Sequence, residues 1–170
     1  MQLKTARLLI RDFVETDLDV VYAYGSDPDV VRYMPFPPST LEGTREHIAR
    51  CIALAAEQPR RGYDMGIVLQ STGEIIGGIT LHIFEQVNDE AAFSYLLNRA
   101  AWGQGYATEA LAEMLRFGFE QLGLRRIADS CDVENGASAR VMEKCGLRFE
   151  GERDGERLYA LTASEWRETL

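Results

Sequence analysis

The spacing of apolar residues changes about a third of the way along the chain. Up to about residue 60 the spacing is mostly helical, with one strand expected at residues 8–10. Two helices are expected over residues 16–25 and 39–59, because each begins with a capping residue followed by an acid. A shorter helical stretch is expected over residues 27–34, before a run of prolines that would end it.

Beyond residue 60, β-like runs alternate with helical ones. A hairpin is expected first, since two apolar runs flank a Ser-Thr-Gly-Glu turn. The expected strands are 67–69, 75–81, 91–97, 126–133, a short one at 149 and 158–161, and the expected helices run from about 108 to 123 and from 135 to 146. This alternation predicts an α/β fold with a mixed sheet at its core.

Length, composition and charge then restrict the class of protein. The 170 residues suit one domain spanning 1–170, and the net charge of −9 disfavours a nucleic-acid partner, which would need clustered Lys and Arg. No apolar run approaches the roughly 18 residues that cross a bilayer, and no signal peptide is evident, so a cytoplasmic protein without a membrane partner is expected. Three widely spaced cysteines and two histidines predict no disulfide framework and no metal site.

The glycine-rich turn Gly103–Ala107 follows an expected strand and leads into a long helix. A helix N-terminus presents unpaired N–H groups and a partial positive charge, and glycines allow an anion to approach the backbone closely. The turn is therefore a candidate pyrophosphate site, although glycines between a strand and a helix are also common for structural reasons alone. It is neither a P-loop nor a GxGxxG dinucleotide fingerprint.

Residues around this turn resemble the GNAT superfamily of N-acetyltransferases, and within it the Rim-type ribosomal-protein N-acetyltransferase subgroup. The string Trp-Gly-Gln-Gly-Tyr-Ala-Thr-Glu-Ala at 102–110 is similar to the subgroup's loop, with Trp102 where other members have Gln or Arg. The second signature, Asn-x-x-Ser-x-x-Val-x-Glu-Lys-x-Gly, is similar to residues 135–146. The resemblance implies a GNAT fold: a mostly antiparallel sheet of about six to seven strands, splayed at the coenzyme A site, with about four to five helices.

By this resemblance the cofactor is acetyl-CoA, with no metal. The loop amides would hold the pyrophosphate, the strand before the loop would pair with the pantetheine arm, and the second signature would lie beside the sulfur and a CoA phosphate. The cofactor-binding residues implied are Tyr95, Leu96, Leu97, Gly103, Gln104, Gly105, Tyr106, Ala107, Thr108, Asn135, Ser138 and Lys144.

The resemblance also implies direct attack of an amine on the thioester. Many members protonate the leaving thiolate with a Tyr, which is Met142 here, so Ser138 is the candidate for that hydrogen bond or proton. Glu150 is a candidate general base, alongside Glu90, Asp132, Glu152 and Glu156. A site without a strong base would favour an α-amine, because its pKa of about 7.8 lies about 2.6 units below that of a lysine-like amine.

The acceptor amine is not identified by these motifs. A protein N-terminus of the ribosomal-protein type is the leading hypothesis, with acetylation or succinylation of an aminoglycoside or polyamine as the alternative, and a catalytically silent CoA-binding sensor as an alternative of another class. By analogy with the family, the N-terminal helices wall the acceptor site, with Tyr33, Met34 and Phe36 as lining candidates. The resemblance to Rim-type proteins also suggests a homodimer.

Overall fold

One sheet runs through the whole molecule. The computed structural model describes residues 1–84, 87 and 89–168, and their strands lie in the order β1-β2-β3-β4-β5-β6-β8-β7. The strands are β1 (Gln2–Lys4), β2 (Leu8–Asp12), β3 (Gly62–Leu69), β4 (Ile75–Ile83), β5 (Glu90–Leu97), β6 (Arg126–Asp132), β7 (Arg148–Arg153) and β8 (Glu156–Thr162). Within these described residues, β5 and β6 are the parallel pair, and all other neighbours are antiparallel.

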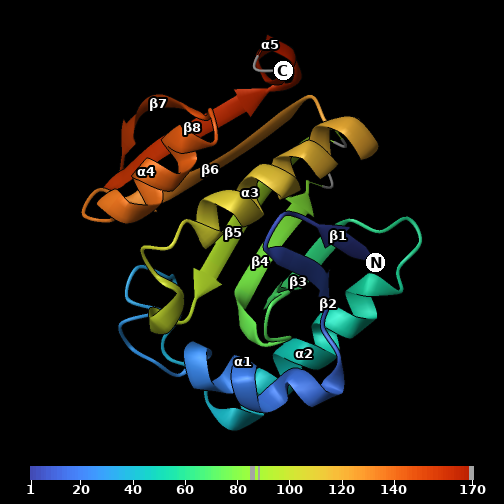
Figure 1. Cartoon of the computed structure of the whole chain (residues 1–170). Coiled ribbons are helices and arrows are strands. Elements are labelled where there is room, and N and C mark those ends of the chain that lie inside the picture. Colours follow the sequence, from blue (N-terminus) through green and yellow to red (C-terminus); the bar gives the residue numbers. More distant parts are fainter. Residues whose placement is uncertain (85–86, 88, 169–170) are drawn as a thin grey trace.

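Helices cover both faces of this sheet (Figure 1). They are α1 (Leu18–Gly25), α2 (Leu41–Ala55), α3 (Tyr106–Arg116), α4 (Gly136–Lys144) and α5 (Ala163–Glu168). α1 and α2 share a small core with Phe13 and Val68 on one face, whereas α3 and α4 bury their apolar sides in the main core on the other. The apolar stripe of α3 explains its place, because Leu111 and Met114, spaced by three residues, are both fully buried.

The sheet divides into two parts at β5 and β6. These strands pair only at Glu90 with Arg126 and at Ala91 with Ile127, and beyond these pairs they diverge. In Figure 1 the strands β6, β8 and β7 accordingly lean away from the β1–β5 part of the sheet. The gap opens toward the carboxyl end of β5, where the glycine-rich turn begins.

Most expected elements are present, but several differ from the expectation. β1 raises the strand number to eight, since residues 2–4 pair with β2. Residues 27–34 form successive turns instead of a helix, closed by bonds such as Val30 N to Asp27 O at 3.1 Å. At the first expected helix cap, Thr16 gives no capping bond; the adjacent Asp17 is buried and accepts both Arg11 guanidinium nitrogens, at 2.8 and 2.9 Å.

The second expected helix is present, but its cap is one residue later than the Ser39–Glu42 capping pattern predicts. Thr40 begins α2 with its hydroxyl accepting the N–H of Gly43 at 3.1 Å. Helix α3 starts at Tyr106, two residues before the expected position, because Gly105 already has a left-handed conformation and serves as its N-cap. The pyrophosphate candidate loop therefore ends directly on the helix N-terminus.

Candidate active site

The splayed edge of β5 carries backbone groups that no strand pairs. Asn98 N donates to Ile76 O on the β4 side at 2.9 Å, so the alternate residues Tyr95 and Leu97 direct their backbone N–H groups toward the gap. Leu97 O is bound by the indole N–H of Trp102 at 2.8 Å. Free amides along an open strand edge suit the amide groups of a pantetheine arm and the carbonyl of a thioester.

The glycine-rich turn closes the open end of this gap. Gly103 and Gly105 have φ angles of 73° and 80°, which L side chains rarely adopt. A Cβ at Gly103 would meet nothing within 4 Å, so the loop is open on that side. No side chain caps the first N–H groups of α3, and these groups remain available to an anion.

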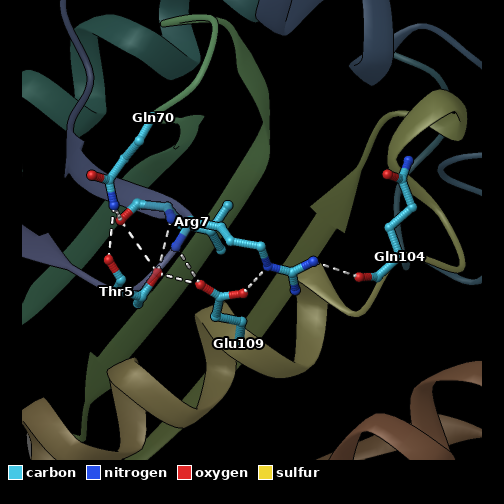
Figure 2. A network of polar contacts seen from close by, with 6 residues as sticks. Thr5, Arg7, Gln70, Gln104 and Glu109 are labelled. Atoms are coloured by element: carbon cyan, nitrogen blue, oxygen red, sulfur yellow. Dashed lines mark hydrogen bonds and ion pairs between the residues drawn. The ribbon is translucent and has the colours of Figure 1, made fainter.

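A polar network fixes the loop to the start of the chain (Figure 2). Arg7 donates from Nε to Glu109 Oε2 at 2.6 Å and from Nη1 to Gln104 O at 3.0 Å, and its guanidinium lies 4.5 Å from the centre of the Tyr106 ring. Glu109 Oε1 also accepts Thr5 Oγ1 at 2.6 Å and Arg7 N at 2.9 Å. Burial alone would raise the pKa of Glu109, but these hydrogen bonds outweigh it and lower the pKa. We name this set the Arg7–Glu109 clamp.

A hydroxyl pair bridges the two sides of the gap. Tyr95 Oη on β5 and Ser138 Oγ in the first turn of α4 are 2.9 Å apart. Asn135 caps α4 by accepting Ser138 N at 3.1 Å and so fixes the position of the serine. Burial raises the pKa of Tyr95 to about 12, which keeps its proton in place at neutral pH. The structure thus brings together three of the predicted residues at one point.

Two further observations concern the same place. Met142 is 1% exposed and belongs to the main core, so it presents no group to the gap. Asp129 on β6 lies beyond the last β5–β6 pair, and burial raises its pKa to about 7. Asp129 was not among the residues predicted from the sequence. The signal that could have identified it is a carboxylate at an alternate strand position whose neighbours on the same face are apolar. An acid that titrates near neutral pH can exchange a proton at working pH.

A cavity of about 520 Å³ lies on the opposite face of the sheet, between it and α1 and α2. Its lining is mainly apolar, and it includes Met34 and Phe36, two of the three residues predicted there, but not Tyr33. Ser94 and Leu96 line it from β5, so the cavity reaches the strand that borders the gap. Leu96, whose backbone is predicted to contact the cofactor, also lines this cavity. The arrangement places this cavity on one face of the sheet and α3, which follows the glycine-rich loop, on the other.

The remaining predicted residues lie elsewhere. Glu150 is in an exposed ion pair with Arg126 at 2.6 Å, and Glu90 pairs with Arg125 at 3.1 Å, so both are at the closed end of the gap. Lys144 is exposed in the last turn of α4. Its predicted contact with a CoA phosphate stays a prediction.

The described residues form neither a metal-binding group nor a membrane-spanning helix. Within the described ranges, no three His, Cys, Asp or Glu side chains are grouped so that they could hold a metal ion. In the same part of the chain, no helix has the length and apolar character needed to cross a membrane.

A splayed parallel pair, a glycine-rich loop on a helix N-terminus and an adjoining cavity are the features expected of an acyl-CoA-dependent acyltransferase. The family profile described as an acetyltransferase (GNAT) domain matches residues 7–148. The uncharacterized N-acetyltransferase YnaD of Bacillus subtilis (strain 168) is 32% identical over 178 residues, covering 98% of this chain and 99% of the relative. The crystal structure of a GNAT-family acetyltransferase from Bacillus anthracis is 31% identical with a TM-score of 0.83, covering 96% of this chain and 99% of the other. The chain belongs to the GNAT acetyltransferase family.

A ribosomal-protein relative matches part of the chain. The ribosomal-protein-serine acetyltransferase of Escherichia coli (strain K12) is 30% identical over 92 residues, which cover 54% of this chain and 51% of the relative. The chain is thus an acetyl-CoA-dependent N-acetyltransferase with Rim-type relatives. Its own residues fit acetyl-CoA, because the loop glycines and the uncapped N-terminus of α3 meet the unpaired edge of β5.

Proposed function

We propose that this enzyme acetylates the α-amino group of a protein or peptide N-terminus. The observation that carries the proposal is the charge of the acceptor cavity. Asp64 is the one carboxylate among the described residues that line it, and Arg50 lines it as well. A polyamine or an aminoglycoside carries several positive charges and would need several carboxylates, whereas one α-amine needs only one.

Each part of the site then has a defined task. Acetyl-CoA supplies an activated acetyl group as a thioester. The amides of residues 103–108 hold its pyrophosphate, and the free N–H groups of β5 bind the pantetheine arm and polarise the thioester carbonyl. Ser138, with Tyr95, donates a hydrogen bond to the sulfur as the C–S bond breaks. The amine attacks from the cavity side, next to Ser94 and Leu96.

The partial match to the ribosomal-protein-serine acetyltransferase supports an α-amine acceptor. Chemistry supports it too, because at pH 7 an amine with a pKa of about 7.8 is roughly one part in seven uncharged, compared with less than a thousandth for a lysine-like amine. Asp64 lies on β3, two strands away from β5. Because a fraction of such an amine is already uncharged at pH 7, the attacking nitrogen does not need direct contact with this carboxylate.

A panel of acceptors tests the proposal. We would measure kcat/KM for peptides that start with Ala or Ser, the same peptides blocked at the N-terminus but containing lysine, spermidine, and an aminoglycoside. The proposal predicts the highest kcat/KM for the free α-amine peptides. A higher kcat/KM for spermidine or the aminoglycoside would contradict it.

A small-molecule amine is the second candidate, and the cavity's size favours it. About 520 Å³ is within the range of pockets that enclose small ligands, and Pro37 and Met34 roof it from the α1–α2 connection. A small monoamine with an apolar body would fit this lining. A small apolar monoamine added to the panel tests this candidate: turnover of that amine, with no turnover of the peptides, would decide for it.

A further inference from the structure

Three polar side chains cross the floor of the acceptor cavity in one row. Asp64 on β3 is directly opposite Thr80 on β4, and Thr80 is directly opposite Ser94 on β5. Directly opposed residues of antiparallel strands point to the same face, with Cβ atoms about 5 Å apart. All three residues line the cavity. The row runs from the interior of the sheet to the strand that borders the gap.

The row is already oriented at its far end. Thr80 Oγ1 donates to Asp64 Oδ1 at 3.0 Å, so its hydrogen is engaged and its lone pairs face the rest of the row. Ser94 is the next hydroxyl in the row, and one water molecule between the two hydroxyl groups would connect it to Thr80. Since neighbouring strands are about 4.8 Å apart, Asp64 lies about 10 Å from the edge of β5. A carboxylate at that distance can act on the amine only through intervening groups.

We propose that Asp64 receives the proton that the acceptor amine must lose, through the hydroxyl groups of Thr80 and Ser94. This inference rests on the proposed acetyltransfer and answers which group serves as its base. The ammonium gives one proton to Ser94 Oγ, Ser94 passes its own to Thr80, and Thr80 passes its own to Asp64, which becomes a neutral carboxylic acid. The free amine then forms the C–N bond, the C–S bond breaks with its electron pair left on sulfur, and the second amine proton goes to that thiolate.

Other titratable groups face the same end of the cavity. His47 and Arg50 line it from α2, Tyr24 from α1 and Tyr95 from β5. The buried Cys51 of α2 does not line the cavity, but its Sγ lies 3.5 Å from His47 Nε2. Burial lowers the pKa of His47, and the field of Asp64 opposes this only in part. Burial raises the pKa of Cys51 to about 12, so its thiol stays protonated at neutral pH. His47 is thus the rival base, and its Nδ1 lies 3.3 Å from Arg50 Nη2.

The pH dependence of kcat/KM distinguishes this proposal from a structural role. If Asp64 keeps the proton of the ammonium, enzyme and substrate together lose none before the transition state, and kcat/KM is flat below the pKa of the amine. In Asp64→Asn the amine must first lose its proton to water. Below the pKa of the amine, kcat/KM of this variant therefore falls about tenfold for each pH unit by which the pH is lowered. The deficit of this variant relative to the wild type should grow about 30-fold from pH 7.5 to pH 6.

The experiment uses the full chain with a Ser-starting tripeptide amide, or with the amine that the wild type acetylates fastest. Thr80→Val should show the same slope and Thr80→Ser the wild-type profile, which keeps the test valid if Asp64→Asn does not fold. Asp19→Asn removes an exposed carboxylate of α1 outside the cavity lining and should match the wild type.

Calorimetry of the tripeptide binding to the protein with CoA gives a second readout, and Asp64→Asn should lose much less affinity than it loses kcat/KM at pH 6. Three results would each overturn the proposal. The pH profiles of kcat/KM for Asp64→Asn and the wild type could be parallel, or His47→Gln could show the slope that is expected of Asp64→Asn. The third is a loss of tripeptide affinity large enough to account for the whole decrease in kcat/KM. A wild type that acetylates no amine would instead refute the proposed function.

Discussion

Breaking the Arg7–Glu109 clamp should weaken acetyl-CoA binding without changing the chemical step. Arg7→Lys keeps the charge but cannot donate from Nε to Glu109 and from Nη1 to Gln104 O at the same time. The carbonyl of Gln104 lies between two glycines in left-handed conformations, so losing its donor frees the loop. Reordering one residue costs about 1–2 kcal/mol, which binding must then supply. We therefore expect KM for acetyl-CoA to rise about tenfold, since that corresponds to about 1.4 kcal/mol.

Steady-state kinetics would measure both KM values and kcat for Arg7→Lys, with CoA affinity from calorimetry. Arg45→Lys is the control, because Arg45 also forms an exposed ion pair, with Glu42, on α2. The control should leave both KM values unchanged. If Arg7→Lys left KM for acetyl-CoA within twofold of the wild type, or lowered kcat while KM stayed the same, the clamp would have no role in shaping the loop.

Three further changes test the rest of the site. Gly105→Ala forces a side chain into a φ of 80° and should weaken CoA binding about tenfold by calorimetry, whereas Gly73→Ala, at a φ of 76° in the β3–β4 turn, should lose similar stability but keep CoA affinity. Ser138→Ala or Tyr95→Phe should lower kcat about tenfold or more with little change in either KM, since each removes a donor near the sulfur. Folding raises the pKa of Asp129 from its ordinary value near 4 to about 7, so its contribution to stability is full below pH 4 and is lost as pH rises to 7. At pH 8, Asp129→Asn should therefore be more stable than the wild type, with an unfolding free energy higher by at most about 4 kcal/mol and a correspondingly higher melting temperature. Near pH 4 this difference in stability should vanish.

Local sequence predicted the parts of the site that are local in the structure. The loop at residues 103–107 could be recognised because its function depends on consecutive backbone N–H groups and on glycines beside them. Asn135 and Ser138 were implied by the resemblance of residues 135–146 to the family's second signature, and the structure places them at a helix cap and in its first turn. The pairing of Tyr95 with Ser138 could not be predicted, because it joins residues 43 positions apart across the gap.

The acids show a similar limit. Glu150 was a reasonable base candidate from its position near the last turn, but Arg126, from another strand, holds it in an exposed ion pair. Asp64 was overlooked because the expected strand started at residue 67, whereas β3 starts at Gly62 and carries Asp64 on its cavity face. Which carboxylate faces a cavity depends on strand register, and register is set by partners distant in the sequence.

The central claim is that acetyl-CoA binds at the loop and the open edge of β5 and gives its acetyl group to an amine. Free-thiol release from acetyl-CoA, measured with and without the tripeptide amide and the other amines of the panel, tests it most directly. The account predicts amine-dependent release by the wild type and tenfold weaker use of acetyl-CoA by Gly105→Ala. Absence of CoA binding by the folded wild type, measured in the same samples by calorimetry, would contradict it.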